Sequence, residues 1–240
     1  MEEHPVLPED RAARRRWLRR YKEIDSLLSL IEPSLDKPLE DCSVVDIGCG
    51  AGSLSIPIAK RVKDVLGIDA SERLIGIAKE WAEKEGLTNI RLEPVSVYDF
   101  EEKGFDLAIA SDVIEHVPDQ RRFLEVLVNS LRVKGAFYLT TNNRLWPLEG
   151  HHNLPFLSYL PRNLADRYVR FMGKGDHFRI YPLTLSDLKR LLDHFPVSYE
   201  LKPPRNPRTR LYRLGKKLVL ADEVFWNLAN AFQIVGVRSA

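Results

Sequence analysis

The fold of this chain is decided by one stretch, Val44-Val45-Asp46-Ile47-Gly48-Cys49-Gly50-Ala51-Gly52-Ser53. An apolar run contains an acidic residue, three glycines follow at every second position, and a helical pattern of apolar residues opens after them. This order predicts a buried strand, a tight turn and the N-terminus of a helix. Glycine suits such a turn because it adopts positive φ and leaves the backbone open to a ligand. The helix N-terminus adds unpaired N–H groups.

The glycine spacing separates two classes of nucleotide site. A dinucleotide fingerprint has the spacing G-x-G-x-x-G, in which the third glycine allows the helix to pack on the strand. Here the spacing is G-x-G-x-G, and Ser53 stands where that third glycine belongs. A nicotinamide dehydrogenase is therefore a weaker interpretation, and an ordinary strand–helix turn is the remaining alternative.

A second acid-tipped strand follows over 65–69, and Asp69 lies 17 residues after Gly52. A carboxylate at this point of a βαβ unit can accept hydrogen bonds from a ribose diol. Ser71 is a natural N-cap for a helix that runs through Glu85 and stops at Gly86. The alternative role for Asp69 is a second cap on the same helix.

Further strands are predicted over 90–95, 104–110 and 135–141, with a helix over 120–131. The fourth strand continues into Ser111-Asp112-Val113-Ile114-Glu115-His116-Val117-Pro118-Asp119. The run F-D-L-x-x-x-x-D-V-I-E-H-V-x-D, together with the glycine turn and Asp69, resembles the class I S-adenosylmethionine (SAM) methyltransferases. The most specific resemblance is to the UbiE/UbiG-like (methyltransferase type 11/12) family, and it covers residues 40–141.

This resemblance implies an α/β fold with a Rossmann-like seven-stranded, mostly parallel sheet. The implied strand order is 3-2-1-4-5-7-6, with the last strand antiparallel, helices on both faces and a cap insertion. It also implies SAM as cofactor and S-adenosylhomocysteine as product. Ser96 stands where the family has the Asp that accepts from adenine, which is a departure from the pattern. The residues expected to bind the cofactor are Asp46, Gly48, Cys49, Gly50, Gly52, Asp69, Ala70, Ser96, Val97, Asp99 and Ser111.

Three histidines, His116, His151 and His152, are the candidates for a catalytic base, because an imidazole suits proton removal near neutral pH. Asp112, Glu115 and His116 could also share one face of a helical turn and bind a divalent cation, as some quinone O-methyltransferases of similar pattern do. We adopt the alternative that they stabilise the loop, so no metal site is predicted. His151 and His152 would point to opposite sides of an extended chain and so would not share one ion. A purely structural role for this pair is the other interpretation.

We expect a single methyltransferase domain over 1–240 with four parts. These are an N-terminal basic helix or lid at 1–35, a SAM-binding core at 36–141, a substrate cap at 142–182 and a C-terminal part at 183–240. The cap is rich in aromatic residues and proline, shows no clean periodicity, and follows the fifth strand, at whose carboxyl end ligands sit. The C-terminal part should hold a helix over 184–195 and strands over 196–201 and 232–237.

The net charge of +2 conceals two basic segments, 11–22 and 202–217, each with seven Lys or Arg residues and no acid. They favour contact with a membrane surface or anionic headgroup, and less strongly with RNA, although a solvated helix face is the plainer alternative. Trp17 and Tyr21 in the first segment are candidate lid residues. The two cysteines show no disulfide or zinc pattern, and neither a signal peptide nor an 18-residue apolar run is present. We therefore expect a cytoplasmic protein, either free or peripheral to the membrane.

The expected reaction is methyl transfer to a small or amphipathic acceptor that resembles a quinone, a lipid or a metabolite. Oxygen is the preferred acceptor atom and carbon the second choice, since no Asn/Asp-Pro-Pro-Tyr/Phe run follows the fourth strand. One alternative is a tRNA-modifying methyltransferase that uses the basic segments. The other is a non-catalytic binding module that keeps the SAM fold.

Overall fold

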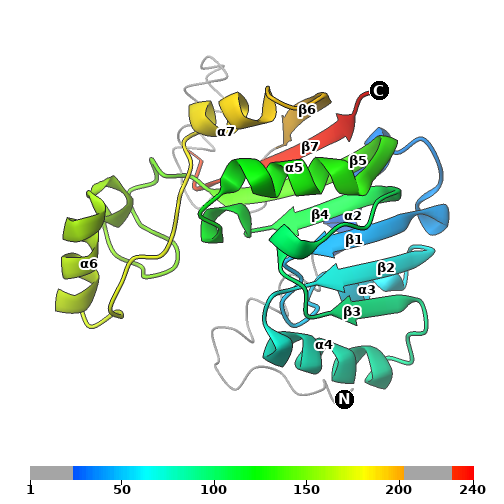
Figure 1. The fold of residues 1–240 in the computed structure, drawn as a ribbon, viewed down its shortest axis with the longest axis horizontal. Helices are drawn as coiled ribbons and strands as arrows, with labels where there is room; N and C mark the ends of the chain where they lie inside the picture. Colours follow the sequence, from blue (N-terminus) through cyan, green and yellow to red (C-terminus); the bar gives the residue numbers. More distant parts are fainter. Residues whose placement is uncertain (1–23, 203–228) are drawn as a thin grey trace.

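A seven-stranded sheet forms the centre of the molecule in the computed structural model, which describes residues 24–202 and 229–240 (Figure 1). The strand order is β3-β2-β1-β4-β5-β7-β6. The first five strands are parallel, whereas β7 runs antiparallel to both β5 and β6. The predicted order and the antiparallel last strand are confirmed. The strands are β1 Ser43–Ile47, β2 Asp64–Ile68, β3 Ile90–Glu93, β4 Phe105–Ser111, β5 Leu131–Asn142, β6 Val197–Lys202 and β7 Ala231–Arg238.

Helices cover both faces of this sheet, and successive strand residues supply the two cores. Val44 packs in a core cluster with α2, whereas its neighbour Val45 packs in the cluster that contains α5 and α7. This division follows from the alternation of side chains along a strand. Because both faces are covered, the central strands are almost continuously apolar. The helices are α2 Ile24–Ile31, α3 Ser55–Ala59, α4 Glu72–Lys84, α5 Gln120–Ser130, α6 Arg162–Phe171 and α7 Leu185–Leu192.

The helix ends follow the capping rules that the sequence indicates. Ser71 caps α4, since its Oγ accepts the Leu74 N–H at 3.4 Å, and Gly86 follows the helix with φ of 65°. Helix α7 begins with a reciprocal capping box between Thr184 and Asp187. These contacts satisfy N–H groups that have no partner within the helix.

Strand β5 starts at Leu131, four residues before the predicted start. Two of the four intervening residues, Arg132 and Lys134, are charged and hide the strand in the sequence, yet Arg132 is held by ion pairs with Asp36 and, at 2.6 Å, with Asp106. Helix α5 consequently ends at Ser130. Helix α3 is shorter than the apolar pattern after the glycine turn suggests, at five residues.

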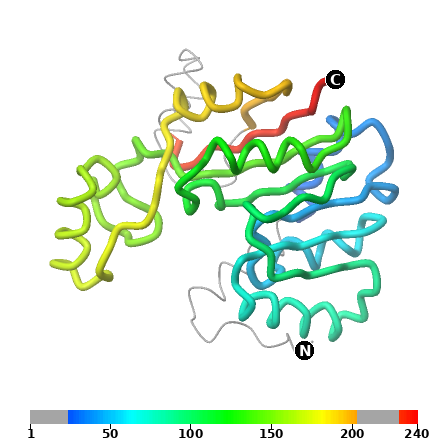
Figure 2. The backbone as a smooth tube through the Cα atoms, in the orientation of Figure 1, coloured from blue at the N-terminus to red at the C-terminus, as the bar shows by residue number. Residues whose placement is uncertain are grey.

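The cap segment leaves the sheet after β5 and stands to one side of it (Figure 2). It contains a 3₁₀ turn, η5 Leu157–Tyr159, and helix α6. Sequence periodicity missed α6 because the helix buries only Ala165 and Val169. The cap has its own small core cluster, made of Leu154, Leu157, Ala165, Val169, Phe178 and Ile180.

Several expectations fall outside the described residues, namely the basic segment 11–22 with Trp17 and Tyr21, and the basic segment 202–217 beyond Lys202. Among the helices that the structure describes, none is both long enough and apolar enough to cross a bilayer.

Candidate active site

The predicted cofactor residues gather at the carboxyl ends of the parallel strands, where ligands of such sheets bind. We call the loops that follow β1, β2, β3, β4 and β5 the carboxyl rim. The glycine turn follows β1, Asp69 and Ala70 follow β2, and Ser111 is the last residue of β4. The sheet therefore brings together residues that are up to 65 positions apart, from Asp46 to Ser111.

All three glycines of the turn have positive φ, at 73°, 55° and 78°. A Cβ at Gly48 would lie 2.6 Å from Val113, and one at Gly52 would lie 2.9 Å from Ile56. At Gly50 it would meet nothing within 4 Å. Side chains of Val113 and Ile56 therefore fill the Cβ positions of Gly48 and Gly52, whereas the Cβ position of Gly50 is open. That this turn binds a ligand stays a prediction.

Asp69 links the glycine turn to the second βα junction. Its Oδ2 accepts the N–H of Gly50 at 2.9 Å, and its Oδ1 accepts the N–H of Ser71 at 2.9 Å. Because Ser71 caps α4, Asp69 does not act as the direct helix cap. The carboxylate is only half-buried, so it stays accessible to a ligand at the rim.

Asp46 and the Cys49 side chain lie beneath the turn. Asp46 is 2% exposed, and its Oδ2 accepts a hydrogen bond from the Ser55 Oγ at 2.5 Å. The Cys49 N–H donates to the Ile68 carbonyl at 2.9 Å, and burial raises the pKa of its thiol. These two side chains shape the turn from below, and a role in direct cofactor contact stays a prediction.

The segment after β3 forms the 3₁₀ turn η3 Val97–Asp99. Ser96 caps it, since its Oγ accepts the Tyr98 N–H at 3.3 Å. Val97 is half-buried and Asp99 is exposed, as is Ala70 on the neighbouring loop. Ser111 is buried, with its Oγ 3.1 Å from the Thr140 Oγ1.

Asp112 turns the chain sharply after β4. It has φ of 59°, a left-handed conformation that is costly for a residue other than glycine. Thr140 on β5 stabilises this conformation, because its Oγ1 donates to Asp112 Oδ1 at 2.9 Å and accepts the Asp112 N–H at 3.0 Å. The chain then enters the 3₁₀ turn η4 Ile114–His116.

Glu115 on η4 is fully buried at the rim. Its Oε2 accepts from Thr141 Oγ1 at 3.0 Å, and its Oε1 accepts from Asn142 Nδ2 at 2.9 Å. Desolvation, helped by the negative charge of Asp112, raises the pKa of Glu115 to about 7. The Tyr181 N–H donates to the Glu115 carbonyl at 2.7 Å, so the end of the cap is tied to η4.

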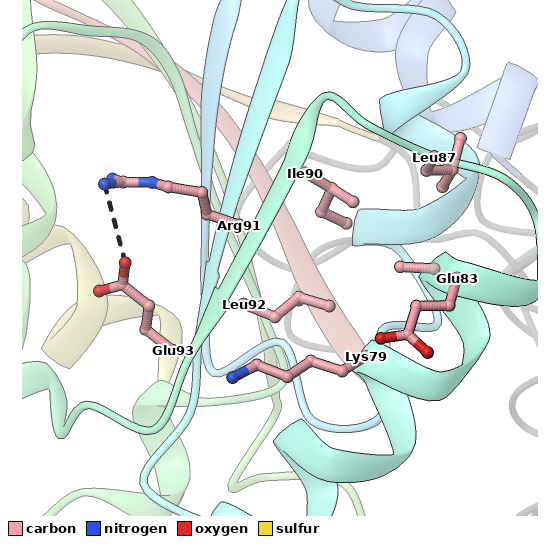
Figure 3. A pocket seen from close by; sticks show the side chains of 8 residues that line it. Lys79, Glu83, Leu87, Ile90, Arg91, Leu92 and Glu93 are labelled. Atoms are coloured by element: carbon pink, nitrogen blue, oxygen red, sulfur yellow. Dashed lines mark ion pairs between the residues drawn. The ribbon is translucent and has the colours of Figure 1, made fainter.

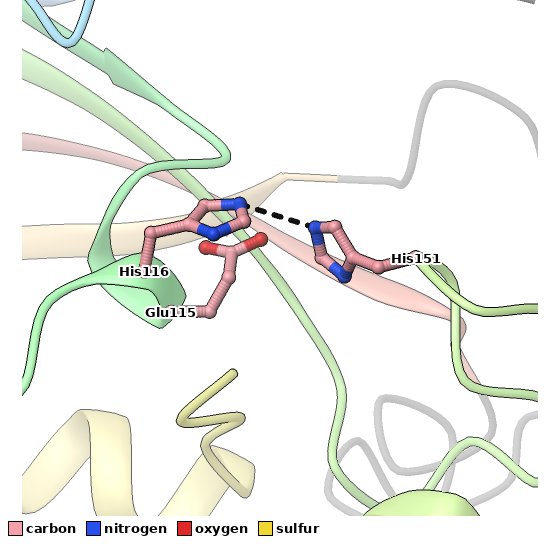
Figure 4. Close-up of side chains that lie close together, drawn as sticks. All are labelled: Glu115, His116 and His151. Atoms are coloured by element: carbon pink, nitrogen blue, oxygen red, sulfur yellow. Dashed lines mark hydrogen bonds between the residues drawn. The ribbon is translucent and has the colours of Figure 1, made fainter. Parts of the chain in front are cut away.

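Two histidines from distant segments meet beside Glu115 (Figure 4). The Nε2 atoms of His116 and His151 are 3.1 Å apart, and the rings are nearly perpendicular. Desolvation and the neighbouring His151 lower the pKa of His116. Although desolvation opposes its charge, the hydrogen bond to Glu149 raises the pKa of His151. The two imidazoles are thus divided into a weaker and a stronger base.

Glu149 organises both histidines of the cap. It is 5% exposed, and its Oε1 accepts from His151 N at 2.9 Å and from His151 Nδ1 at 2.8 Å. Its Oε2 accepts from His152 N at 2.6 Å and binds His152 Nδ1 at 3.0 Å. Although burial opposes ionisation, these hydrogen bonds lower the pKa of Glu149 to about 2. The expectation of an extended backbone is wrong, because His151 and His152 lie in a turn and both rings reach one carboxylate.

The sequence profile of the methyltransferase domain family matches residues 38–166, which is more than half of the chain. The chain belongs to the class I SAM-dependent methyltransferases. The ubiquinone biosynthesis O-methyltransferases of Sinorhizobium fredii and Rhizobium etli are 38% and 36% identical to this methyltransferase over 148 residues. The alignments cover 61% of this chain and 56% of each relative, so the chain matches about half of their length.

Solved structures agree with the fold of this methyltransferase. Magnesium protoporphyrin IX methyltransferase (ChlM) from Synechocystis, with bound S-adenosylhomocysteine, has a TM-score of 0.61 and 18% identity, covering 97% of this chain and 89% of its own. A SAM-dependent methyltransferase from Mesorhizobium loti has a TM-score of 0.62 and 17% identity, covering 90% and 97%. At such low identity these similarities show the fold alone.

The sequence interpretation missed the residues that hold the histidines and Glu115 in place. Glu149 lies only two positions before His151, so an acid beside paired histidines was the available signal. Thr141 and Asn142 had none, because their partner Glu115 lies on the 3₁₀ turn η4, more than 20 residues earlier in the sequence.

One carboxylate oxygen of Glu115 and ring nitrogens of His116 and His151 all lie within 4.8 Å of one another. A divalent cation could bridge groups at this spacing. Asp112, which the sequence grouped with Glu115 and His116, instead receives the hydrogen bond of Thr140. The expected absence of a metal stays a prediction.

A groove of about 390 Å³ lies between α4 and the edge strand β3 (Figure 3). Lys79 and Glu83 border it on the helix, and Arg91 and Glu93 form an ion pair at 3.7 Å on the strand. None of the predicted site residues lines this groove, so it is separate from the methyltransferase rim.

Proposed function

We propose that this methyltransferase transfers the methyl group of SAM to a hydroxyl oxygen of a small or amphipathic acceptor. The observation that carries the proposal is the contact between His116 and His151 at 3.1 Å, which joins an imidazole of the carboxyl rim to one of the cap. A hydroxyl acceptor must lose its proton as it accepts the methyl group, and an imidazole is suited to receive it near neutral pH.

The rim residues fit the cofactor. The space over Gly50 would receive its methionine end, the Asp69 carboxylate its ribose diol, and the loop with Ser96, Val97 and Asp99 its adenine. When bound, SAM supplies a methyl group on a sulfonium sulfur that is already electrophilic. The protein therefore has mainly to align the acceptor oxygen, exclude water and accept a proton.

Oxygen is favoured over carbon and nitrogen by two observations. The relatives that align over 148 residues are named O-methyltransferases. The rim also offers two imidazoles beside a buried carboxyl group, which is an arrangement for proton removal. The cap, with its aromatic residues, would cover the acceptor.

The proposal is tested with the full-length protein in two steps. Calorimetry should show binding of SAM and S-adenosylhomocysteine and no binding of NAD. Incubation with SAM and a panel of catechols, phenols, primary amines and enolisable carbon acids should then yield methyl ethers, identified by mass spectrometry. Methylated amines or carbon acids without any ether would contradict the assignment to oxygen, and absence of SAM binding would favour a non-catalytic module.

A separate question is which anionic partner the two basic segments contact. We expect peripheral contact of 11–22 and 202–217 with anionic headgroups, with RNA as the alternative. Retention of tRNA that weakens steeply with salt would support the RNA alternative. Sedimentation with anionic vesicles, together with no retention of tRNA, would support contact with a membrane surface.

Metal dependence is tested on the same reaction. The oxygens of Glu115 and the Nε2 of His151 already have protein partners. We therefore expect that dialysis against EDTA leaves turnover unchanged. Loss of turnover that Mn²⁺ or Mg²⁺ restores would contradict this prediction.

A further inference from the structure

We propose that Glu149 is a positioning residue that fixes the ring of His151 with Nε2 toward the rim, and so makes His151 the proton acceptor of the reaction. This inference rests on the proposed function. It selects one histidine out of the three candidates and gives a role to a buried acid that the sequence interpretation did not include.

Glu149 determines the tautomer of His151. An ionised carboxylate only accepts hydrogen bonds, so the Nδ1 that lies 2.8 Å from Glu149 must carry the proton. In the neutral ring the lone pair is then on Nε2. A second bond, from the His151 N–H to the same oxygen at 2.9 Å, fixes the backbone that carries the ring.

The Nε2 of His151 faces the carboxyl rim. It is the ring nitrogen that does not bind Glu149, and it lies 3.1 Å from the Nε2 of His116 (Figure 4). A polar group at the rim can therefore approach the basic nitrogen of His151 to hydrogen-bond distance. A hydroxyl of the acceptor would take the place that His116 occupies in this contact.

The charges around the ring also matter. Although desolvation opposes it, the hydrogen bond and negative charge of Glu149, with smaller contributions from Glu115 and Asp112, favour the protonated form of His151. The imidazolium produced by proton transfer would thus be stabilised, as in a carboxylate–imidazole pair of a hydrolase triad. Among residues 24–202 and 229–240 no carboxylate hydrogen-bonds the ring of His116, and desolvation and His151 disfavour its charged form.

His152 is the remaining competitor for the role of base. Its Nδ1 binds the other oxygen of Glu149, but its ring packs edge-on against Phe178 in the cap core, with centroids 5.6 Å apart. Its side chain is 15% exposed, against 28% for His151. His152 therefore supports the turn.

The step balances without a further reactant. The acceptor oxygen forms a bond to the methyl carbon as the carbon–sulfur bond of SAM breaks, and that electron pair stays on sulfur. The hydroxyl proton passes to Nε2 of His151 and is later released to solvent. The products are a methyl ether, S-adenosylhomocysteine and one proton.

Asparagine variants distinguish the roles of the two ring nitrogens. The Asn Nδ2 can take the position of the histidine Nδ1, but asparagine has no counterpart of Nε2. His151→Asn should keep the hydrogen bond to Glu149 and lose the base, lowering kcat by about 100-fold or more with the KM for SAM unchanged. Glu149→Gln should lower kcat by at least about tenfold. His177→Asn is the matched control, since His177 pairs with Asp166 elsewhere in the cap at 3.5 Å, and it should leave kcat unchanged.

A readout without turnover comes from nitrogen NMR of the ligand-free protein. Neutral His151 should be in the Nδ1–H form in the wild type and should shift toward the Nε2–H form in Glu149→Gln. An Nε2–H form in the wild type would overturn the proposal, as would a loss of kcat in His152→Asn equal to that in His151→Asn. If Glu149→Gln does not fold, the wild-type tautomer and the two asparagine variants still decide.

These outcomes are distinct from a failure of the proposed function. In that case no hydroxyl would be methylated, whether or not SAM binds, while the NMR spectrum would still report whether Glu149 sets the tautomer of His151.

Discussion

The carboxyl rim and the cap each bury one glutamate, and the pKa values of the two carboxyl groups are shifted in opposite directions. Glu115 at the rim accepts from two neutral groups, those of Thr141 and Asn142, and desolvation next to Asp112 raises its pKa to about 7. Glu149 in the cap is held by two backbone N–H groups and two imidazoles, and these bonds lower its pKa to about 2 against its burial. Burial alone therefore does not determine the pKa of a carboxyl group, because the number and kind of its hydrogen-bond donors also shift it.

The two regions also differ in what holds them in place. The sheet is packed on both faces by two large core clusters, whereas the cap depends on a cluster of six buried residues. Its further links to the sheet include the Tyr181 N–H to Glu115 and the contact between His151 and His116. We therefore expect the cap to open at a lower free energy than the sheet.

The largest predicted effect is a loss of stability on replacing a buried leucine with alanine. We compare this substitution in the sheet and in the cap. Leu107→Ala in β4 should lower the global free energy of unfolding by about 4 kcal/mol, since the packed sheet cannot collapse around the cavity. Leu157→Ala in the cap removes the same atoms. It should leave global unfolding by denaturant nearly unchanged and speed hydrogen exchange over 154–180.

Equal losses of global stability in the two variants would show that the cap and the sheet unfold as one unit. Circular dichroism in urea measures the free energy of global unfolding. Hydrogen exchange followed by mass spectrometry measures the local opening of the cap. Both leucines are fully buried, so exposure does not bias the comparison.

The next effect concerns the pH dependence that the raised pKa of Glu115 implies. The folded protein binds the Glu115 proton more tightly than the unfolded chain, so this contribution to stability is complete below about pH 4.5 and is lost as the pH rises to about 7. Glu115→Gln should remove that decline, which corresponds to about 3 kcal/mol at most. Urea unfolding from pH 4 to 8 measures it.

Glu149→Gln should change the pH dependence of stability in the opposite direction. Glu149 has a lowered pKa, so its contribution is present above about pH 4.5 and is lost as the pH falls toward 2. If Glu115→Gln and Glu149→Gln changed the free energy of unfolding over the same pH range, the distinction between the rim carboxyl and the cap carboxylate would fail.

The same contrast explains what could be predicted from the sequence. The glycine turn, Asp69 and the cap of α4 are local patterns, in which a residue and its partner lie on adjoining segments, and the structure places them as expected. The strand order followed from the family resemblance. The contacts of Glu149 and the contact between His151 and His116 depend on how the cap, residues 142–182, folds back onto the rim, and no periodicity encodes that. Helix α6 was missed for a related reason, because it buries only two of its residues.

A smaller effect separates glycines that pack against protein from the one that faces a ligand. Gly48→Ala should destabilise the fold by about 2 kcal/mol more than Gly50→Ala, because both adopt positive φ but only a Cβ at Gly48 meets Val113, at 2.6 Å. Gly50→Ala should instead weaken SAM binding, since its methyl group would enter the open space. Thermal unfolding and calorimetry measure the two effects. Equal stability of the two variants would mean that Val113 moves away without cost.

The last prediction concerns affinity at the rim, where neither region has to unfold. Asp69→Ala should raise the Kd for SAM about tenfold or more, because the ribose would lose charge-assisted hydrogen bonds. Asp64→Ala is the matched control. Asp64 lies at the other end of β2, where it accepts from Ser43 Oγ at 2.8 Å, so its loss should leave the Kd unchanged. Asp69 also accepts the N–H of Gly50, so a variant that unfolds normally yet binds SAM as tightly as the wild type would show that this carboxylate serves the turn and that the ribose lies elsewhere.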